Sequence, residues 1–363
     1  MTQEKRRQGA LVAMSGGVDS SVAAYLMQKA GFRCLGANMR LHEAGRDEPE
    51  RCAHRDAEDA AGVAEQLGIP YEVLACTAEF QKRVVDKFIR VYEAGGTPNP
   101  CIDCNRFLKF GRLLQEAEAR GLEYVATGHY AQIVYDGDSG RYLLKKALDA
   151  GKDQSYVLYM LTQRQLAHIR FPLGGMEKRQ VRELAEELGF LNAEKRDSQD
   201  ICFVPDGDYG AFLERAAGRP YPAGDFLDLE GRAVGRHRGA VRYTLGQRKG
   251  LGLAMGRPVY VCGKDMAANT VTVGPEDVLY SRFVRVEDLN WISIPVLEAP
   301  MRVRAKTRYH QREQWATARP LENEAIVLEF DEPQRAVTPG QAAVLYNGDV
   351  VVGGGTIAAA YNG

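Results

Sequence analysis

The sequence of 363 residues lacks any uninterrupted run of about 18 apolar residues, the length that a membrane-spanning helix needs. Its start, residues 1–7, is polar and leads directly into an apolar strand, without the apolar core of a secretory signal. These two absences predict a cytoplasmic protein.

Cysteine is scarce and positive charge is not in excess. Seven cysteines are too few for a disulfide scaffold, and their number is odd. With a net charge of −1, the protein is not basic overall, so any nucleic-acid site must come from local clusters of Lys and Arg. Such clusters occur at residues 106–112, 145–152, 236–242, 248–249 and 302–312, although each alone is typical of a solvated surface.

The chain changes character near Asp206. Before it, apolar segments alternate with amphipathic ones, which is typical of a parallel sheet covered by helices on both faces. We expect strands at 10–14, 32–39, 71–75 and 124–127, and helices at 20–30, 56–67, 80–92, 107–120, 163–167 and 178–188. After it, glycine and proline become frequent, and short alternating runs at 259–261, 271–273, 301–306, 325–330 and 342–346 indicate β domains. We therefore predict an α/β domain at residues 1–205, a central β domain at 206–280 and a C-terminal β-barrel domain at 281–363.

The segment Ser15-Gly16-Gly17-Val18-Asp19-Ser20-Ser21 lies between the first expected strand and helix. It is not a Walker A loop, because no Gly-Lys-Ser/Thr follows. Glycines let the backbone approach a phosphate, and the helix N-terminus offers unpaired N–H groups. Asp19 is suited to binding Mg²⁺ or to capping the helix. A second loop, residues 126–130, follows another strand and is expected at the same edge of the sheet.

Two cysteines, Cys101 and Cys104, follow a segment made rigid by two prolines. Cys104 precedes the helix expected from Phe107 and has Arg106 and Lys109 beside it, so we predict a lowered pKa for its thiol. Cys202 lies between an isoleucine and a phenylalanine, where a buried filler is the more common role. The same filler role is expected for Cys34, Cys52, Cys76 and Cys262.

These motifs resemble those of known enzymes. Residues 15–21 match the PP-loop of ATP pyrophosphatases, which transfer AMP to an oxygen of their substrate. Over nearly its whole length, the sequence is similar to the tRNA-specific 2-thiouridylases; the matching segments are 97–100, 126–130, 152–156, 171–172, 198–203, 243–250, 306–309, 330–333 and 337–341. The resemblance implies an enzyme that uses ATP and Mg²⁺ to thiolate the wobble uridine of tRNAs for Lys, Glu and Gln. A cysteine desulfurase or a sulfur-relay protein would be its sulfur donor.

The resemblance also implies roles for individual residues. Cys104 would be the catalytic nucleophile, and Cys202 would carry the sulfur as a persulfide. The residues expected at ATP are Ala13, Met14, Ser15, Gly16, Gly17, Val18, Asp19, Ser20, Met39 and Gly128. Those expected at the target base are Asn99, Pro100 and Cys101, and those expected at tRNA are His129, Lys152, Asp153, Gln154, Arg308, Tyr309 and Gln341.

Cys101 departs from the pattern of many family members, which carry Asp at this place and use it for acid–base chemistry. Asp103 occupies a different place in the loop. Cys101, Cys104 and Cys202 together also match the ligand set of a [4Fe–4S] cluster with one open iron, which related PP-loop thiolases use to hold sulfide. The sulfur carrier is therefore either a persulfide or this cluster. A zinc site is a weaker option, because no second cysteine pair accompanies the first.

Two other classes of protein fit part of the sequence less well. A PP-loop ligase or amidotransferase acting on a small carbonyl compound leaves the three cysteines and the β domains without a purpose. A non-catalytic RNA-binding protein does not explain an intact PP-loop. Release of AMP and pyrophosphate that depends on tRNA would separate the three.

Overall fold

The computed structural model describes residues 8–41, 48–195 and 201–362, of which 48–54 are described by their backbone alone. The side chain of Cys52 and residues 198–200 are outside the described part, so the predictions for them stay predictions. The chain divides into two compact units, and each is described by itself. Unit 1 contains residues 1–84, 101–203 and 349–351, and unit 2 contains residues 85–100, 204–348 and 352–363. Among the described residues, no helix has both the length and the apolar character needed to cross a bilayer.

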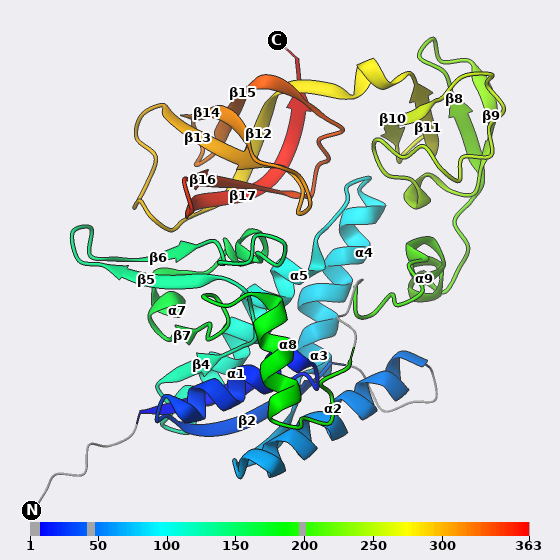
Figure 1. Ribbon diagram of the computed structural model, residues 1–363. Coiled ribbons are helices and arrows are strands. Elements are labelled where there is room, and N and C mark those ends of the chain that lie inside the picture. Colours follow the sequence, from blue (N-terminus) through cyan, green and yellow to red (C-terminus); the bar gives the residue numbers. More distant parts are fainter. Residues whose placement is uncertain (1–7, 42–47, 196–200, 363) are drawn as a thin grey trace, which may run out of the picture. The chain divides into compact units, whose positions relative to one another are not determined.

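A five-stranded parallel sheet forms the centre of unit 1 (Figure 1). Its order is β3-β2-β1-β4-β7, so the first strand of the chain is central and pairs with β2 on one side and β4 on the other. The strands are β1 (Gly9–Ala13), β2 (Arg33–Arg40), β3 (Tyr71–Ala75), β4 (Tyr124–Ala126) and β7 (Ile169–Arg170). The predicted parallel α/β domain is confirmed.

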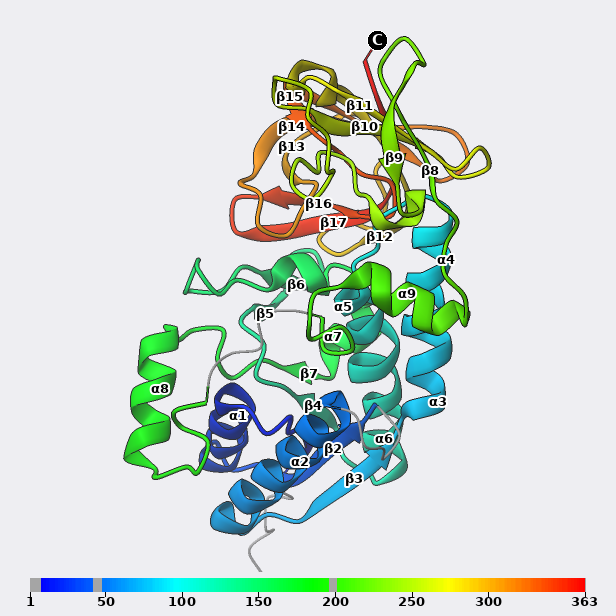
Figure 2. The ribbon, with the colours of Figure 1, turned by 90° about the vertical axis from the view of Figure 1, so that its right-hand side faces the viewer.

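Helices cover both faces of this sheet (Figure 2). On one face, Ala10 and Val12 of β1 pack into a core with α1 (Val18–Lys29), α2 (Glu48–Leu67) and α8 (Lys178–Glu187). On the other face, Leu11 packs against α6 (Leu113–Ala119). Successive residues of a strand point to opposite faces, so a strand buried on both sides is a continuous apolar run, as in Ala-Leu-Val-Ala.

The helical segments around the cysteines are longer than expected. One helical run extends from Pro100 to Ala119, through α5 (Pro100–Asp103), a π-helical stretch (Cys104–Arg112) and α6. The prediction placed its start at Phe107, but a proline fits the first helical turn because its missing N–H would have no partner there. The run before it contains α3 (Thr77–Phe80), a second π-helical stretch (Gln81–Val85) and α4 (Asp86–Glu93).

Unit 1 also contains a β-hairpin that was not predicted, made by β5 (Gln132–Asp136) and β6 (Arg141–Lys145). Both strands contain short apolar runs, Ile133-Val134-Tyr135 and Tyr142-Leu143-Leu144, which were not predicted as strands because they are only three residues long. The remaining elements of unit 1 are α7 (Gln163–Ala167) and a 3₁₀ turn at Ser155–Leu158.

Unit 2 begins with α4, whose Phe88 and Tyr92 pack on Tyr209 and Phe212 of α9 (Tyr209–Ala217). A four-stranded sheet follows, in the order β10-β11-β8-β9. Its strands are β8 (Gly224–Leu227), β9 (Ala233–His237), β10 (Tyr260–Asp265) and β11 (Thr270–Gly274), with 3₁₀ turns at Ala240–Arg242 and Glu276–Leu279. This is the predicted central β domain.

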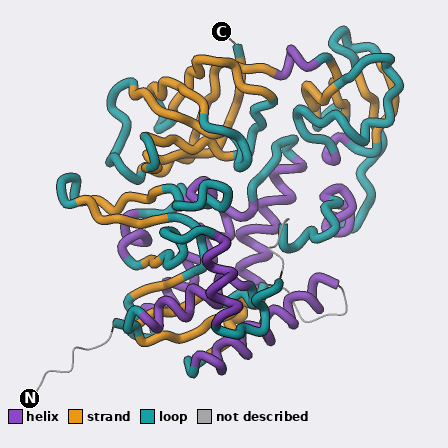
Figure 3. Tube along the Cα trace, in the orientation of Figure 1, coloured by secondary structure: helices purple, strands orange, loops and turns teal. Residues whose placement is uncertain are grey.

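The C-terminal strands of unit 2 form a six-stranded antiparallel barrel in the order β12-β15-β14-β13-β16-β17, closed by pairing of β17 with β12. Figure 3 shows these strands in orange near the C-terminus. Its strands are β12 (Tyr280–Trp291), β13 (Met301–Lys306), β14 (Gln314–Pro320), β15 (Ile326–Arg335), β16 (Ala342–Asn347) and β17 (Val350–Tyr361). Alternate residues such as Val303 and Ala305 fill its core. Closure leaves no unpaired strand edge, and the predicted barrel domain is confirmed.

Candidate active site

The glycine-rich loop joins the end of β1 to the start of α1, with Gly17 at the N-cap position. Its shape is fixed by serine hydroxyls, since Ser20 Oγ and Ser21 Oγ donate to the Gly17 carbonyl at 2.9 and 3.1 Å. Ser20 Oγ also accepts from the Ser15 N–H at 3.2 Å. The described structure has no side-chain cap on α1. The first turn of this helix is thus a suitable place for a phosphate.

Gly16 is the most constrained position of the loop. Its φ of +75° favours glycine, and a Cβ atom there would lie 2.0 Å from the Asp56 carbonyl oxygen of α2. The Gly16 carbonyl accepts from Asn192 Nδ2 at 3.0 Å and from Lys195 Nζ at 3.2 Å. Helix α2 and the turn after α8 therefore hold the loop from outside.

Asp19 does not cap α1, so that prediction is wrong. Its carboxylate instead accepts from Lys178 Nζ at 2.7 and 2.8 Å and from the Tyr130 hydroxyl at 2.7 Å. Lys178 is buried at the start of α8. An unpaired carboxylate would repel phosphates approaching the first turn of α1, and Lys178 neutralises this charge. The carboxylate oxygens of Asp19 are also suitable ligands for Mg²⁺. A bound ion would share these oxygens with Lys178 or displace the Lys178 ammonium from them.

We expect Lys178→Met to weaken ATP binding by about tenfold, because Asp19 then presents an unbalanced negative charge to the phosphates. The measurement is calorimetric titration with ATP, with and without Mg²⁺. Arg179→Met is the matched control, since Arg179 follows on the same helix and pairs with Glu183 at the surface. Equal ATP affinity in wild type and Lys178→Met would refute this role.

The structure brings the second expected loop to the first. A Cβ atom on Gly128 would lie 2.7 Å from the backbone carbon of Asp19, so only glycine allows this approach. Asn38 Nδ2 donates to the Met14 carbonyl at 2.8 Å and ties the ends of β1 and β2 together. Met39, next to Asn38, is half-buried at the same sheet edge. Contact of these residues with ATP stays a prediction.

The thiol of Cys104 is less acidic than predicted. Cys104 is buried, and the loss of hydration raises its pKa to about 11; Lys109 acts in the opposite direction but does not offset it. The prediction was wrong because Cys104 lies inside a continuous helical run rather than before a helix N-terminus. It also assumed solvent access that burial removes.

Cys101 and Cys202 expose part of their surface, and neither of them nor Cys104 forms a disulfide. The pKa of Cys202 is raised to about 12 by desolvation first and by Cys104 and Cys101 next. A charge on Cys101 raises the pKa of Cys104, and charges on Cys104 and Cys101 raise that of Cys202. The three thiols are therefore close enough in unit 1 to interact electrostatically, and we call them the thiol neighbourhood.

The raised pKa predicts how Cys104 reacts with an alkylating agent. Only the thiolate reacts, so its alkylation rate should keep rising about tenfold per pH unit from about pH 7 to about pH 10. The measurement is iodoacetamide labelling followed by peptide mass spectrometry, with exposed Cys101 as the internal control for reagent. A rate that levels off below about pH 8 would contradict the raised pKa.

A metal site would have to be built from the described side chains. Among them, no group of three or more His, Cys, Asp or Glu is arranged to hold a single metal ion. A [4Fe–4S] cluster is larger than one ion and needs its cysteines further apart. The shared neighbourhood of Cys101, Cys104 and Cys202 is compatible with that larger group.

The residues of unit 1 expected at tRNA are engaged within the protein. His129 is buried between Phe110 and Phe171, and burial lowers its pKa well below the usual value. The side chains of Asp153 and Gln154 accept from the backbone N–H groups of Ser155 and Tyr130. Lys152 stands beside them, half-buried. Their contact with tRNA remains a prediction.

In unit 2, the guanidinium of Arg308 donates to the Ala336 carbonyl at 2.6 Å and to Thr338 Oγ1 at 3.0 Å. Tyr309 is half-buried and lies beside His310. Gln341 donates to backbone carbonyls of residues 97 and 98, just before Asn99 and Pro100. These residues hold the barrel and its neighbouring loop in shape.

Sequence reasoning missed Lys178, Asn192 and Lys195, which lie far along the chain from the loop that they hold. It also missed Trp315, an exposed ring flanked by Arg302 at 5.3 Å and Arg304 at 4.8 Å on the barrel. The signal for Trp315 was its place just after the basic run at residues 302–312.

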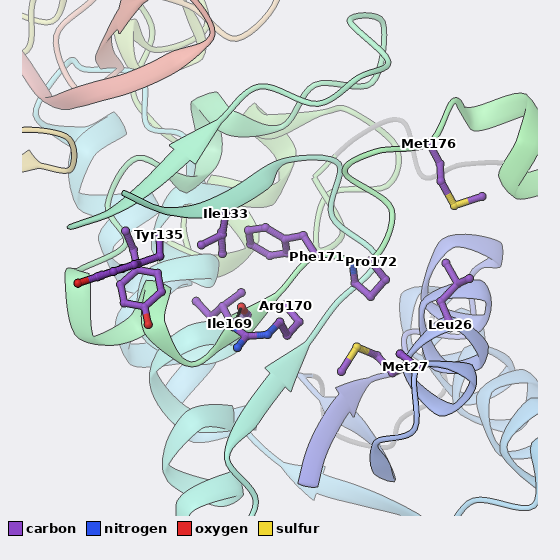
Figure 4. A pocket seen from close by; sticks show the side chains of 11 residues that line it. Leu26, Met27, Ile133, Tyr135, Ile169, Arg170, Phe171, Pro172 and Met176 are labelled. Carbon is purple, nitrogen blue, oxygen red and sulfur yellow. Dashed lines mark hydrogen bonds between the residues drawn. The ribbon is translucent and has the colours of Figure 1, made fainter. Parts of the chain in front are cut away.

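Unit 1 also contains a cavity of about 670 Å³ away from the glycine-rich loop (Figure 4). It is lined mainly by apolar side chains, from the second half of α1, from β5 and from residues 169–176. These include Leu26, Met27, Ile133, Tyr135, Phe171 and Met176. The cavity offers few charges to a nucleotide.

A parallel sheet with a glycine-rich loop after its first strand defines a nucleotide-binding α/β protein. Comparison with family models agrees: residues 8–206 match a tRNA methyl transferase HUP domain. Residues 210–275 match a tRNA methyl transferase PRC-barrel domain, and residues 281–357 match an aminomethyltransferase β-barrel domain.

Relatives define the family more closely. A tRNA-specific 2-thiouridylase MnmA of Acetivibrio thermocellus is 50% identical over 96% of this chain and 98% of its own. A second, from Heliobacterium modesticaldum, is 48% identical over 97% of this chain and 92% of its own. The chain belongs to the MnmA family of tRNA-specific 2-thiouridylases. A solved 4-thiouridine synthetase–RNA complex with bound ATP aligns at 18% identity and a TM-score of 0.34, over 58% of this chain and 50% of that one, which is too distant to bear on function.

Proposed function

We propose that this protein replaces the C2 oxygen of the wobble uridine in tRNA by sulfur, using ATP. One observation carries the proposal: unit 1 contains both a glycine-rich loop suited to phosphates and the three neighbouring thiols of Cys101, Cys104 and Cys202. The family's relatives support the substrate, since they are named for this reaction on tRNA.

The first step activates the uridine. The C2 carbonyl oxygen attacks the α-phosphorus of ATP, a P–O bond forms, and the bond to pyrophosphate breaks. The first turn of α1 binds the phosphates, and Mg²⁺ held by Asp19 would offset their charge. An oxygen is a poor leaving group, whereas AMP departs readily from the adenylated base.

The second step transfers sulfur. Cys202 is exposed and can accept a sulfur atom from a donor protein as a persulfide. The terminal sulfur attacks C2 and expels AMP, which leaves the base joined to Cys202 through a disulfide. Cys104 attacks the Cys202 sulfur, forms the Cys104–Cys202 disulfide and releases 2-thiouridine. A thiol reductant then returns both residues to free thiols.

The target base must leave its stack to reach these groups, at a cost of roughly a few kcal/mol. A wobble base lies in a single-stranded loop, where this cost is lowest. Asn99, Pro100 and Cys101 are the residues we assign to it. The tRNAs for Lys, Glu and Gln are the substrates, and a cysteine desulfurase or sulfur-relay protein is the donor.

A second route keeps the same product but changes the sulfur carrier. The closeness of Cys101, Cys104 and Cys202 in unit 1 supports it, because three cysteines are the ligand set of a cluster with one open iron. These three residues would hold a [4Fe–4S] cluster, which would supply an open iron for sulfide. Iron content and activity before and after anaerobic reconstitution distinguish the routes: full activity without iron excludes the cluster.

The test of the proposed function is the release of AMP and pyrophosphate in the presence and absence of unmodified tRNA. Thiouridylation predicts that both products appear together and depend on tRNA. Release that depends instead on a small carbonyl compound would indicate a ligase, and ATP that is never hydrolysed would indicate an RNA-binding protein.

A further inference from the structure

The chain before Cys101 is tied to the C-terminal barrel within unit 2. We call residues 97–100 the pre-cysteine loop and residues 339–341, between β15 and β16, the barrel turn. The Thr97 N–H donates to the Pro339 carbonyl at 2.9 Å. Gln341 Nε2 donates to the Thr97 carbonyl at 2.8 Å and to the Pro98 carbonyl at 3.3 Å. Three hydrogen bonds thus join the two segments.

Two glycines allow this close approach. Gly340 has a φ of +88°, and a Cβ atom there would lie 2.7 Å from Val91 Cγ1 of α4. A Cβ atom on Gly96 would lie 2.9 Å from the Pro339 carbonyl oxygen. The two segments therefore come into backbone contact, and the Gln341 side chain adds two further hydrogen bonds between them.

The barrel turn is itself fixed in the barrel. The Gly340 N–H donates to the Ile357 carbonyl of β17 at 2.9 Å, and the Ile357 N–H donates to the Gln341 carbonyl at 2.8 Å. Arg308 binds the chain just before the turn through Ala336 and Thr338. A turn held on both sides can act as a rigid support.

We propose that Gln341 is a positioning residue that holds the target-base loop in place. An amide nitrogen has two hydrogens, and both are directed at carbonyls of the pre-cysteine loop. They fix the backbone of Thr97 and Pro98 and, through it, the residues that follow. The inference rests on the proposed function, which assigns Asn99, Pro100 and Cys101 to the target base. Gln341 thereby acts on the base through the loop.

The test is Gln341→Met, which keeps the size of the side chain and removes both donors. We expect kcat for 2-thiouridine formation to fall between about tenfold and a hundredfold, because small displacements of a reacting group are costly. The KM for tRNA should stay within about twofold of wild type. Gln314→Met, in strand β14 of the same barrel, is the matched control and should change neither value.

A second readout is independent of activity. Hydrogen exchange of the Thr97 amide should become faster in Gln341→Met, because its support at Pro339 loosens. An unchanged kcat with a raised KM for tRNA would make Gln341 an RNA contact and overturn the proposal. If wild type forms no 2-thiouridine, the proposed function fails, and the Thr97 exchange alone decides the positioning role, which unchanged exchange would refute.

Discussion

Replacing Cys104 by serine is expected to abolish 2-thiouridine formation, by at least about a thousandfold, while the enzyme still adenylates tRNA. The reason is chemical: serine has nearly the same size but cannot form the disulfide that releases the product from Cys202. Product should therefore remain attached to the protein through Cys202. The measurement is mass spectrometry of nucleosides and of intact protein after one turnover.

Cys262→Ser is the matched control for this variant. Cys262 is half-buried in strand β10 of unit 2, outside the thiol neighbourhood, and its replacement should leave thiolation unchanged. Serine fits the space of a buried cysteine but places a hydroxyl there. The melting temperatures of both variants therefore show whether each protein stays folded. Normal 2-thiouridine formation by a folded Cys104→Ser protein would contradict the role of Cys104 on either sulfur route.

The second large effect is expected for Gly16→Ala, which should weaken ATP binding by more than about a hundredfold. Alanine at a φ of +75° costs roughly 1 kcal/mol or more, and its Cβ would meet the Asp56 carbonyl oxygen at 2.0 Å. The loop must then move away from α2 and lose the bonds from Asn192 and Lys195. The phosphate-binding first turn of α1 would be displaced with it.

A matched control separates the two effects of Gly16→Ala, the steric clash with Asp56 and the backbone strain of a positive φ. Gly31, just after α1, has a φ of +91° and open space around its missing Cβ. Gly31→Ala should lower the free energy of unfolding by about 1 kcal/mol and leave ATP binding unchanged. Calorimetric titration with ATP measures both variants. ATP binding by Gly16→Ala at wild-type strength would show that the loop is not held as described.

The sequence predicted the parts of the fold that depend on local pattern. The buried strands appeared as apolar runs, and the glycine-rich loop stood between the first strand and its helix. The helix from Pro100 began earlier than expected, and the preference of proline for a first helical turn was a signal that could have been used. The hairpin of β5 and β6 was missed although each strand contains three apolar residues in a row, because such short runs are hard to separate from loop residues.

The candidate site was predictable only in part, because its supports come from distant segments. Lys178 is 159 residues from Asp19, and no spacing rule links them. Burial decides the pKa of Cys104, and burial is a property of packing that a sequence of neighbouring charges does not give. The two backbone partners of the Gln341 amide lie 244 and 243 residues earlier in the chain, so no local pattern pointed to them, and its expected contact with tRNA stays a prediction.

The most direct test of the account is mass spectrometry of the nucleosides from unmodified tRNA after incubation with the protein, ATP, Mg²⁺ and a sulfur donor. The account predicts 2-thiouridine at the wobble position, formed only with ATP and accompanied by AMP. It predicts no product with Cys202→Ser. A methylated uridine in its place, or no new nucleoside from a protein that binds both ATP and tRNA, would contradict the account.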